Sequence, residues 1–369
     1  MYRTIAVWTA IAAISASPLA AQVQSEKATY RVQRIAEGLE NPWALALLPD
    51  GRLLVTERPG RLRVVENGAL QPNPLAGVPE VWARGQGGLF DLALHPDFAA
   101  NRLLYFSYAA PVGSGALTRL ARARLGAAGL ENVETLFESA PAVSSARHFG
   151  GRIVFGRDGK VYLTTGDRAE DMRSQDGRDL NGKLVRLEPD GKVPADNPYL
   201  GRSDVRPEIF ALGLRNTQGM ALDANGAIWG ADHGAQGGDE LNSLVRGQNY
   251  GWPIITHSRN YGSGTQIGEA TSRPGYADPR VIWTPSIAPS GLAVYAGAAF
   301  PGWQGSFLVG ALRGQGLYRI ELQADGSHRQ ERLLAELGAR IRDVRIDPQG
   351  RVYVLTDARN GMLARLDPG

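Results

Sequence analysis

The chain has 369 residues, of which 43% are apolar, 21% are charged and 46 are glycine. This composition can bury a large core, and its glycine content disfavours a helical bundle and favours a turn-rich β protein. The absence of cysteine excludes disulfides, thiolate nucleophiles and zinc held by cysteine. The net charge is only +3, with basic residues spread along the chain, which disfavours nucleic-acid binding.

The first 21 residues have the pattern of an export signal. Arg3 precedes the apolar run from Ile5 to Ile14, and small residues follow up to Ala21. This order predicts cleavage near Ala21 and one mature domain over residues 22–369. An uncleaved anchor is the alternative, but the run is short for a membrane span. No later segment has 18 uninterrupted apolar residues, so we expect a soluble exported protein without stable membrane insertion.

A tight turn followed by an apolar strand recurs along the rest of the chain. The six segments are Asp50–Thr56, Asn101–Ser107, Asp158–Thr164, Asn225–Gly230, Gln304–Val309 and Gln349–Val354. Asp-Gly and Asn-Gly dipeptides supply the positive φ angles of tight turns, and the β-branched and aromatic residues after them favour strands. Matching apolar strands precede several of these turns, as at 43–48, 151–155 and 341–346. The pattern predicts β-hairpins.

The spacing of these hairpins is roughly 45 to 80 residues, near the blade length of β-propellers. We therefore predict an all-β fold, a six-bladed β-propeller in a single domain. Two long insertions rich in Gly, Asp, Asn and Pro, at 165–205 and 232–285, mark the expected active face. Two β-sandwich domains are the alternative, which the lack of a linker-like change in composition disfavours.

A histidine and a carboxylate flank the third of these hairpins. His148 precedes its first strand and Asp167 follows its second strand, so we expect the two side chains to meet. A carboxylate in that position fixes the imidazole tautomer and raises its basicity. Alternatively, Asp167 only accepts backbone hydrogen bonds of its own loop. Among the other histidines, His95 is expected to be structural and His328 to be solvated.

Two further segments carry polar groups after apolar stretches. Arg215 and Asn216 offer a fixed cation beside an amide, which suits an oxyanion or a cofactor carbonyl, although a surface arginine at a strand end fits equally well. The segment Gly234–Asn242 combines flexible backbone with carboxylate and amide oxygens, which calcium prefers. No Gly-x-Ser-x-Gly elbow, P-loop or Gly-x-Gly-x-x-Gly fingerprint supports a serine esterase or a nucleotide-binding protein.

Taken together, five segments resemble the soluble aldose sugar dehydrogenases that use pyrroloquinoline quinone. They are Gln86–Phe98, the hairpin from His148 to Asp167, Arg215–Gly219, Gly234–Trp252 and Arg340–Val344. They occur in the family's order and cover nearly the whole mature chain. The resemblance implies a six-bladed propeller, a periplasmic location, calcium and the quinone cofactor.

The same resemblance implies catalytic roles. His148 would be the general base that takes the proton from the anomeric hydroxyl of an aldose, forming a lactone while hydride passes to C5 of the quinone. Asp167 would orient the base. Arg215, with Asn216 beside it, would stabilise negative charge on the C5 oxygen.

Calcium would act on the same quinone carbonyl. The resemblance implies that the main-chain carbonyls of Gly234 and Ala235 hold this ion. A second calcium would bind Glu240 and the carbonyl of Tyr250.

The quinone cofactor has three carboxylates, and arginine binds carboxylates well in bidentate geometry. Arg313, Arg340 and Arg342 occupy the positions that the resemblance assigns to these contacts, with Gln86 and Tyr261 as further cofactor contacts.

Two departures from the glucose-type enzymes fall where those enzymes touch sugar. Arg147 replaces an acidic residue and Met172 replaces a glutamine. They predict broad or non-glucose aldose specificity. The expected partners are an aldose and an electron acceptor, and the expected assembly is a monomer or a homodimer.

Two other functions remain as alternatives. A calcium-dependent propeller lactonase needs several side-chain metal ligands on the axis and leaves the three arginines unexplained. A noncatalytic propeller that binds a protein or glycan leaves His148 and Asp167 without a role.

Overall fold

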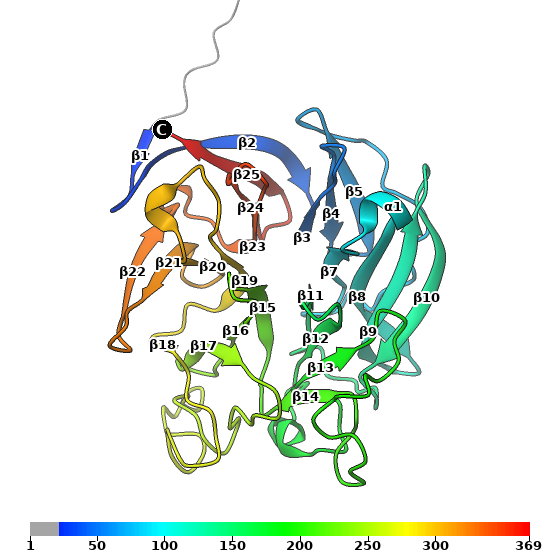
Figure 1. The fold of residues 1–369 in the computed structure, drawn as a ribbon, viewed down its shortest axis with the longest axis vertical. Coiled ribbons are helices and arrows are strands. Elements are labelled where there is room, and N and C mark those ends of the chain that lie inside the picture. The colour runs from blue at the N-terminus through cyan, green and yellow to red at the C-terminus, as the bar shows by residue number, and fades with distance from the viewer. Residues whose placement is uncertain (1–21) are drawn as a thin grey trace, which may run out of the picture.

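The computed structural model describes residues 22–369, so the predicted export signal lies outside the described residues. These residues form six antiparallel sheets in a ring, which confirms the six-bladed β-propeller (Figure 1). The innermost strand of each sheet contacts the innermost strands of its two neighbours. The alternative of two β-sandwich domains is therefore wrong.

The first three blades follow the chain in order. The first comprises β3 (Pro42–Leu47), β4 (Leu53–Glu57), β5 (Arg61–Glu66) and β6 (Ala69–Leu70). The second comprises β7 (Leu89–Leu94), β8 (Leu103–Val112), β9 (Gly115–Leu125) and β10 (Leu130–Glu138), with the short helix α1 (Phe98–Asn101) after β7. The third comprises β11 (Gly150–Phe155), β12 (Val161–Thr165), β13 (Lys183–Leu187) and β14 (Ile209–Leu212), with η1 (Asp171–Gln175) after β12.

The fourth and fifth blades have the same order. The fourth comprises β15 (Thr217–Leu222), β16 (Ile228–Asp232), β17 (Asp239–Leu244) and β18 (Val281–Trp283). The fifth comprises β19 (Pro289–Val294), β20 (Phe307–Ala311), β21 (Gly316–Leu322) and β22 (His328–Leu333), with η2 (Pro301–Trp303) after β19 and η3 (Ala335–Leu337) after β22.

The sixth blade closes the ring by joining the two ends of the described chain. It comprises β23 (Ile341–Ile346), β24 (Val352–Thr356), β25 (Gly361–Pro368), β2 (Thr29–Leu39) and β1 (Gln22–Gln24). Strand β2 pairs antiparallel with β25, with Tyr30 opposite Pro368 and Leu39 opposite Gly361. Pairing an N-terminal strand with the last blade leaves no gap in the ring (Figure 1).

Each of the six predicted hairpins joins the innermost strand of a blade to its second strand. Gly51 has φ 88° and Gly159 has φ 75°, as expected for tight turns that need glycine. The apolar core lies between neighbouring blades: Leu54 of the first blade and Leu104 of the second are fully buried in one cluster. The sequence pattern therefore predicted the blades correctly. Among residues 22–369, no helix is long and apolar enough to span a membrane.

Antiparallel strands place alternate loops at opposite ends of the propeller. The segments that enter the innermost strands, and those that follow the second strands, share one end, which we call the His148 end. Part of the predicted insertion at 165–205 does not lie there. Residues 188–208 leave β13 beside the Asp158 turn, where Arg186 pairs with Asp158 (2.8 Å). The prediction that this part of the insertion lies on the active face is therefore wrong, because the strand direction places it at the opposite end of the propeller.

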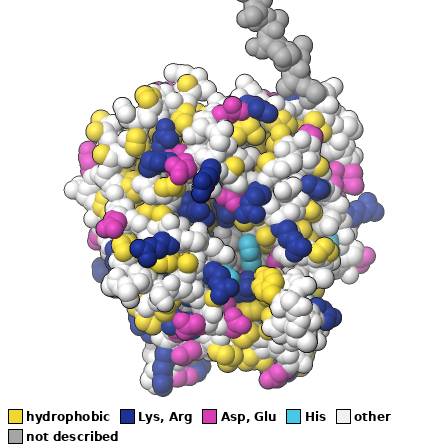
Figure 2. Space-filling model, turned by 180° about the vertical axis from the view of Figure 1, so that it is seen from behind, with side chains coloured by type: hydrophobic (Ala, Val, Ile, Leu, Met, Phe, Trp, Pro, Cys, Tyr) yellow, Lys and Arg dark blue, Asp and Glu magenta, His cyan; other side chains and the backbone are white. Residues whose placement is uncertain are grey.

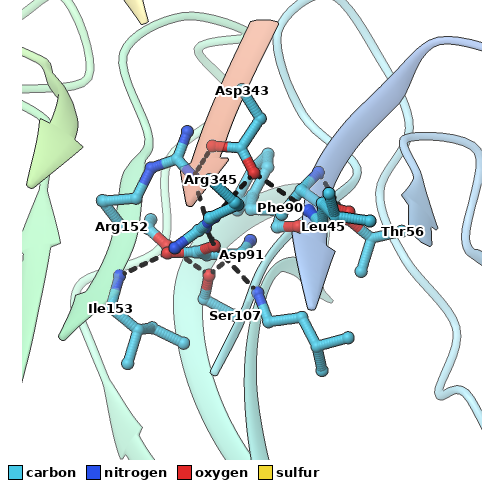
Figure 3. Close-up of polar contacts among 12 residues, drawn as sticks. Leu45, Thr56, Phe90, Asp91, Ser107, Arg152, Ile153, Asp343 and Arg345 are labelled. Atoms are coloured by element: carbon cyan, nitrogen blue, oxygen red, sulfur yellow. Dashed lines mark hydrogen bonds and ion pairs between the residues drawn. The ribbon is translucent and has the colours of Figure 1, made fainter. Parts of the chain in front are cut away.

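A buried ionic cluster ties the innermost strands together (Figure 3). Arg152 Nη1 on β11 lies 3.2 Å from Asp91 Oδ1 on β7 and 2.9 Å from Asp343 Oδ1 on β23. Arg345 on β23 binds both carboxylates, at 2.6 Å to Asp91 and 2.9 Å to Asp343. Asp343 also accepts the N–H of Leu45 on β3 (2.9 Å).

This ionic cluster reaches a further blade, because Arg152 Nε donates to the carbonyl of Gln218 on β15 (2.9 Å). Arg152 is 1% exposed, and both aspartates are also buried. The cluster thus joins β3, β7, β11, β15 and β23 near the axis.

Candidate active site

The predicted pair of His148 and Asp167 forms at the His148 end. His148 Nδ1 lies 2.6 Å from Asp167 Oδ1, and both side chains are buried. The other carboxylate oxygen accepts a hydrogen bond from Trp252 Nε1 (2.8 Å). Asp167 also accepts the N–H of Ala169 (2.7 Å), so it serves its own loop and the imidazole together. An ionised Asp167 fixes the proton on Nδ1 and leaves Nε2 as the basic atom.

The backbone holds His148 in an unusual conformation. Its φ is 52°, in the left-handed region that side chains other than glycine seldom adopt. Its N–H donates to Gln86 Oε1 (2.8 Å). Backbone strain of this kind collects at functional sites because the surrounding structure has to enforce it.

The surroundings keep the imidazole neutral. Burial lowers the pKa of His148, and the charges of Arg215 and Arg147 lower it further, against the opposing effect of Asp167. A neutral imidazole at neutral pH is the state that a general base requires.

Arg215 and Asn216 belong to the same site. Both backbone N–H groups bind the carboxylate of Asp232, at 2.9 Å and 2.6 Å. The Arg215 Nη1 donates to the carbonyl of Gly234 (2.7 Å), and the guanidinium carbon lies 5.0 Å from the ring centroid of Trp252. The Arg215 Nε is buried without a hydrogen-bond partner among residues 22–369, so it can donate to a ligand.

A cavity of about 130 Å³ borders Asn216 and Gln86, the side chain that accepts the His148 N–H. Aromatic and polar side chains line it: Trp43, Arg58, Gln86, Phe90, Phe149, Asn216, Gln218, His233, Leu312, Arg340, Arg342 and Asp357. Figure 2 shows the face of the molecule with histidine in a central hollow and Lys or Arg side chains beside it. Flat aromatic walls and guanidinium groups together suit a planar anionic ligand.

Two of the arginines that line this cavity, Arg340 and Arg342, are held by Gln218 and Asp357. Arg342 Nη1 donates to Gln218 Oε1 (3.0 Å), and Arg342 Nη2 lies 3.2 Å from Asp357 Oδ2. Arg340 Nη2 lies 2.7 Å from the same oxygen. Burial alone would raise the pKa of Asp357, but Arg342 and Arg340 outweigh it and lower that pKa to about 2. The Arg342 Nε is buried and has no partner among the described residues.

Not every predicted cofactor contact reaches the cavity. Gln86, Asn216, Arg340 and Arg342 line it. Arg215 and the exposed Arg313 do not, although Leu312, the neighbour of Arg313, does.

Tyr261 also lies away from the cavity. Its side chain is 68% exposed, and its hydroxyl donates to the carbonyl of Ala235 (2.7 Å). For Arg313 and Tyr261, contact with a cofactor stays a prediction.

The predicted metal ligands lie around a second, smaller pocket. Gly234, Glu240 and Tyr250 line it together with Arg215 and Asp232. The predicted metal-binding carbonyls carry other contacts, since that of Gly234 accepts from Arg215 and that of Ala235 from Tyr261. Within residues 22–369 there is no group of three or more His, Asp or Glu side chains placed to hold a metal.

Glu240 is the one carboxylate of the predicted metal-ligand set. Burial raises its pKa to about 8, and nearby carboxylates, including Asp232 and Asp239, add to this effect. It accepts a hydrogen bond from Asn242 (3.0 Å), and no cationic side chain of residues 22–369 pairs with it. The predicted ligands thus supply oxygen donors only, with one carboxyl side chain that no cationic residue of the described chain pairs with.

Four residues that hydrogen-bond or pair with the predicted site residues were not themselves predicted from the sequence: Trp252, Asp232, Gln218 and Asp357. A signal existed for Asp232 and Asp357. Each stands at the end of the second strand of a blade, the position that Asp167 has in the third blade. No such signal marked Trp252, which reaches Asp167 from the long loop between β17 and β18.

Comparisons with known proteins show what this chain is similar to. The family described as Glucose / Sorbosone dehydrogenase matches residues 39–365. The aldose sugar dehydrogenase YliI of Escherichia coli (strain K12) is 40% identical over 357 residues, which cover 95% of this chain and 96% of that protein.

Solved structures are also similar. The soluble aldose sugar dehydrogenase of Escherichia coli in its apo-form has a TM-score of 0.88 and 40% identity, over 92% of this chain and 100% of that one. The PQQ-bound aldose sugar dehydrogenase of Streptomyces coelicolor has a TM-score of 0.75 and 29% identity, over 92% and 99% of the two chains.

Proposed function

Because this chain belongs to the glucose/sorbosone dehydrogenase family, whose members are oxidoreductases acting on sugar CH–OH groups, we propose that it oxidises the anomeric hydroxyl of aldoses to lactones. Pyrroloquinoline quinone and calcium would be its cofactors, and the periplasm its location. The observation that carries the proposal is the buried pair of His148 and Asp167 (2.6 Å) beside a cavity lined by Arg340 and Arg342.

His148 performs the proton transfer in this proposal. Asp167 holds Nδ1–H, so Nε2 accepts the proton of the anomeric hydroxyl. The hydrogen bond from Trp252 to Asp167 and the one from the His148 N–H to Gln86 fix the direction of the ring. Proton loss from the hydroxyl pushes electrons toward C1, which prepares C1 to release hydride.

The cavity residues fit pyrroloquinoline quinone. This cofactor is planar and carries three carboxylates, and when bound it supplies the acceptor for hydride. Arg342 and Arg340 would hold carboxylates, and the unpartnered Nε of Arg342 is a donor that a carboxylate would satisfy. Arg215, with its unpartnered Nε, would stabilise negative charge beside the reacting carbonyl.

The second pocket fits calcium in its donor chemistry. Calcium binds oxygen ligands from carboxylates and main-chain carbonyls. Glu240 and the carbonyl of Tyr250 would hold one calcium, and the carbonyls of Gly234 and Ala235 would hold the other, which acts on the cofactor. Bound calcium would polarise the cofactor carbonyl as a Lewis acid.

The residues at positions 147 and 172 support broad aldose specificity. Arg147 is exposed and stands next to His148, and Met172 is 60% exposed. Neither presents the acidic or amide oxygen found at these positions in the glucose-type enzymes. A large preference for glucose over other aldoses in a turnover panel would contradict this part of the proposal.

Reconstitution tests the function. Purified protein is stripped with a chelator and then given calcium and pyrroloquinoline quinone, separately and together, with an artificial dye as electron acceptor. We expect aldose-dependent dye reduction only when both are present. Tight quinone binding without activity on any aldose would point to another alcohol substrate. Hydrolysis of lactones without the quinone would instead support the lactonase alternative.

The pH dependence tests the base. We expect kcat/KM to fall as pH falls through the pKa of His148, because a protonated imidazole cannot accept the substrate proton. Because burial lowers the pKa of His148, this acid limb of the pH profile should have its midpoint below the ordinary histidine pKa. Asp167→Asn removes the charge that raises the His148 pKa, so the limb should move to lower pH while the plateau rate drops. A limb that moves to higher pH in Asp167→Asn would reject the assignment.

A further inference from the structure

Arg168 follows Asp167 directly and has no role in the site described above. Its side chain is fully buried, and its guanidinium binds main-chain carbonyls. Nε donates to the carbonyl of Arg147 (3.0 Å), Nη1 donates to that of Ala116 (2.8 Å), and Nη2 donates to that of Ser145. The planar fork of one arginine thus holds three separate points of the chain.

These contacts surround His148. Arg147, on one side of the histidine, is held through its carbonyl, and the guanidinium carbon of Arg168 lies 3.6 Å from the ring centroid of Phe149 on the other side. The Arg168 N–H donates to the carbonyl of His148 itself (3.3 Å). Asp167 and Arg168 therefore act on the same residue, the first on its ring and the second on its main chain.

The loop before β11, which carries His148, and the loop after β12, which carries Arg168, approach each other closely. His148 and Arg168 both have positive φ, at 52° and 61°. A Cβ at Gly166 would lie 2.1 Å from the His148 carbonyl oxygen, so only glycine fits there. The left-handed conformation of His148 is costly for a residue with a side chain and needs neighbours that enforce it.

Burial of Arg168 disfavours its charged form. Among residues 22–369 no carboxylate forms an ion pair with it, and burial lowers its pKa to about 10. An apolar residue in its place would remove this charge but would leave three buried carbonyls without their donor, so Arg168 also contributes to stability. A lysine carries the same charge but lacks the planar fork that reaches several carbonyls. The planar fork thus explains why an arginine rather than a lysine stands here, and its contacts on both sides of His148 connect it to the site.

We propose that Arg168 is the positioning residue of the base: it fixes the main chain on both sides of His148 and so directs His148 Nε2 at the substrate. The inference rests on the proposed function of His148. Arg168 does not line the cofactor cavity and its side chain forms no hydrogen bond with the ring of His148, so we assign its effect on the base to the main chain of residues 145–149.

The test is chemical rescue of Arg168→Ala in the protein loaded with calcium and pyrroloquinoline quinone. We expect kcat for aldose oxidation to fall about 10²-fold, the scale of a misplacement of roughly 1 Å at a reacting group. Quinone affinity is measured alongside, because Phe149 packs on Arg168 and also lines the cavity, and we expect it to fall less than kcat. Low guanidinium chloride, compared with sodium chloride at equal ionic strength, should restore part of kcat by refilling the guanidinium site.

Arg102→Ala is the matched control. Arg102 also donates to a main-chain carbonyl, that of Leu125 (2.8 Å), and its guanidinium lies 5.8 Å from the Phe98 ring, far from His148 in the second blade. Its kcat should be normal and insensitive to guanidinium. A normal kcat in Arg168→Ala, or a loss that guanidinium does not reverse, would overturn the positioning role.

Arg168→Lys provides the second readout if the alanine variant does not fold. Loosening residues 145–149 should expose His148 and relieve the effect of burial, so the acid limb of kcat/KM should move to higher pH. Asp167, Arg147 and Arg215 keep their charges in this variant. An unchanged limb with normal kcat would reject the inference. The proposed function fails separately, if the unsubstituted protein shows no quinone-dependent aldose oxidation.

Discussion

Replacing His148 by alanine is expected to lower kcat for aldose oxidation by about 10² to 10⁴-fold, the usual contribution of a general base. The reason is geometric. Nδ1 of His148 is engaged with Asp167 at 2.6 Å, which leaves Nε2 as the basic atom of this ring. The measurement is steady-state turnover of the reconstituted enzyme with saturating dye.

Measuring quinone binding by this variant distinguishes a loss of catalysis from a loss of the cofactor site. Arg340 and Arg342 do not contact the imidazole, so His148→Ala should bind the quinone about as well as the unsubstituted protein. His328→Ala is the control, since His328 is an exposed residue of β22. Near-normal turnover in His148→Ala would refute the role of this residue as the base.

Replacing Arg152 by methionine is expected to lower the free energy of unfolding by about 3 to 5 kcal/mol, as when one partner of a buried ion pair is removed. Asp91 and Asp343 would then share Arg345 alone, both with almost no access to water. The carbonyl of Gln218 would also lose its donor. Unfolding in urea, followed by tryptophan fluorescence, measures the effect.

An arginine at the surface provides the comparison. Arg52 pairs with Asp50 at 2.7 Å, and both side chains are substantially exposed. Arg52→Met should change the free energy of unfolding by only about 0 to 1 kcal/mol. Equal effects of Arg152→Met and Arg52→Met would show that the ionic cluster at the axis contributes no more to stability than a surface pair.

The blades could be predicted from local sequence because each hairpin is a local unit. Asp50-Gly51 and Asp158-Gly159 bring the φ angles of tight turns, and the apolar residues that follow them form strands whatever lies elsewhere in the chain. The pairing of β2 with β25 had no such local signal, since it joins the two ends of the described chain.

The site was predicted where one hairpin carries both partners. His148 and Asp167 flank β11 and β12, so the antiparallel pairing of these strands brings them together. The second strands of other blades end in the same way, which places Asp232 and Asp357 at the same end of the propeller. Arg342 and its unpartnered Nε also lie there.

Contacts between blades depend on distances that sequence spacing does not encode. Trp252 reaches Asp167 across 85 residues, and Gln218 reaches Arg342 across 124. Arg168 could not be predicted for a related reason. It binds three main-chain carbonyls, and because every residue has such a carbonyl, the sequence does not mark these partners.

The sequence by itself determined the repeated hairpins, the number of blades and the pairing of the base with its carboxylate, because these follow from turns and strands that are close in the chain. Only the tertiary structure decided which arginines face the cavity, which loops share the His148 end, and how Arg168 and Trp252 hold the base. Closing the ring brings these groups together, and it is long-range packing between blades, rather than local backbone preference, that sets their positions.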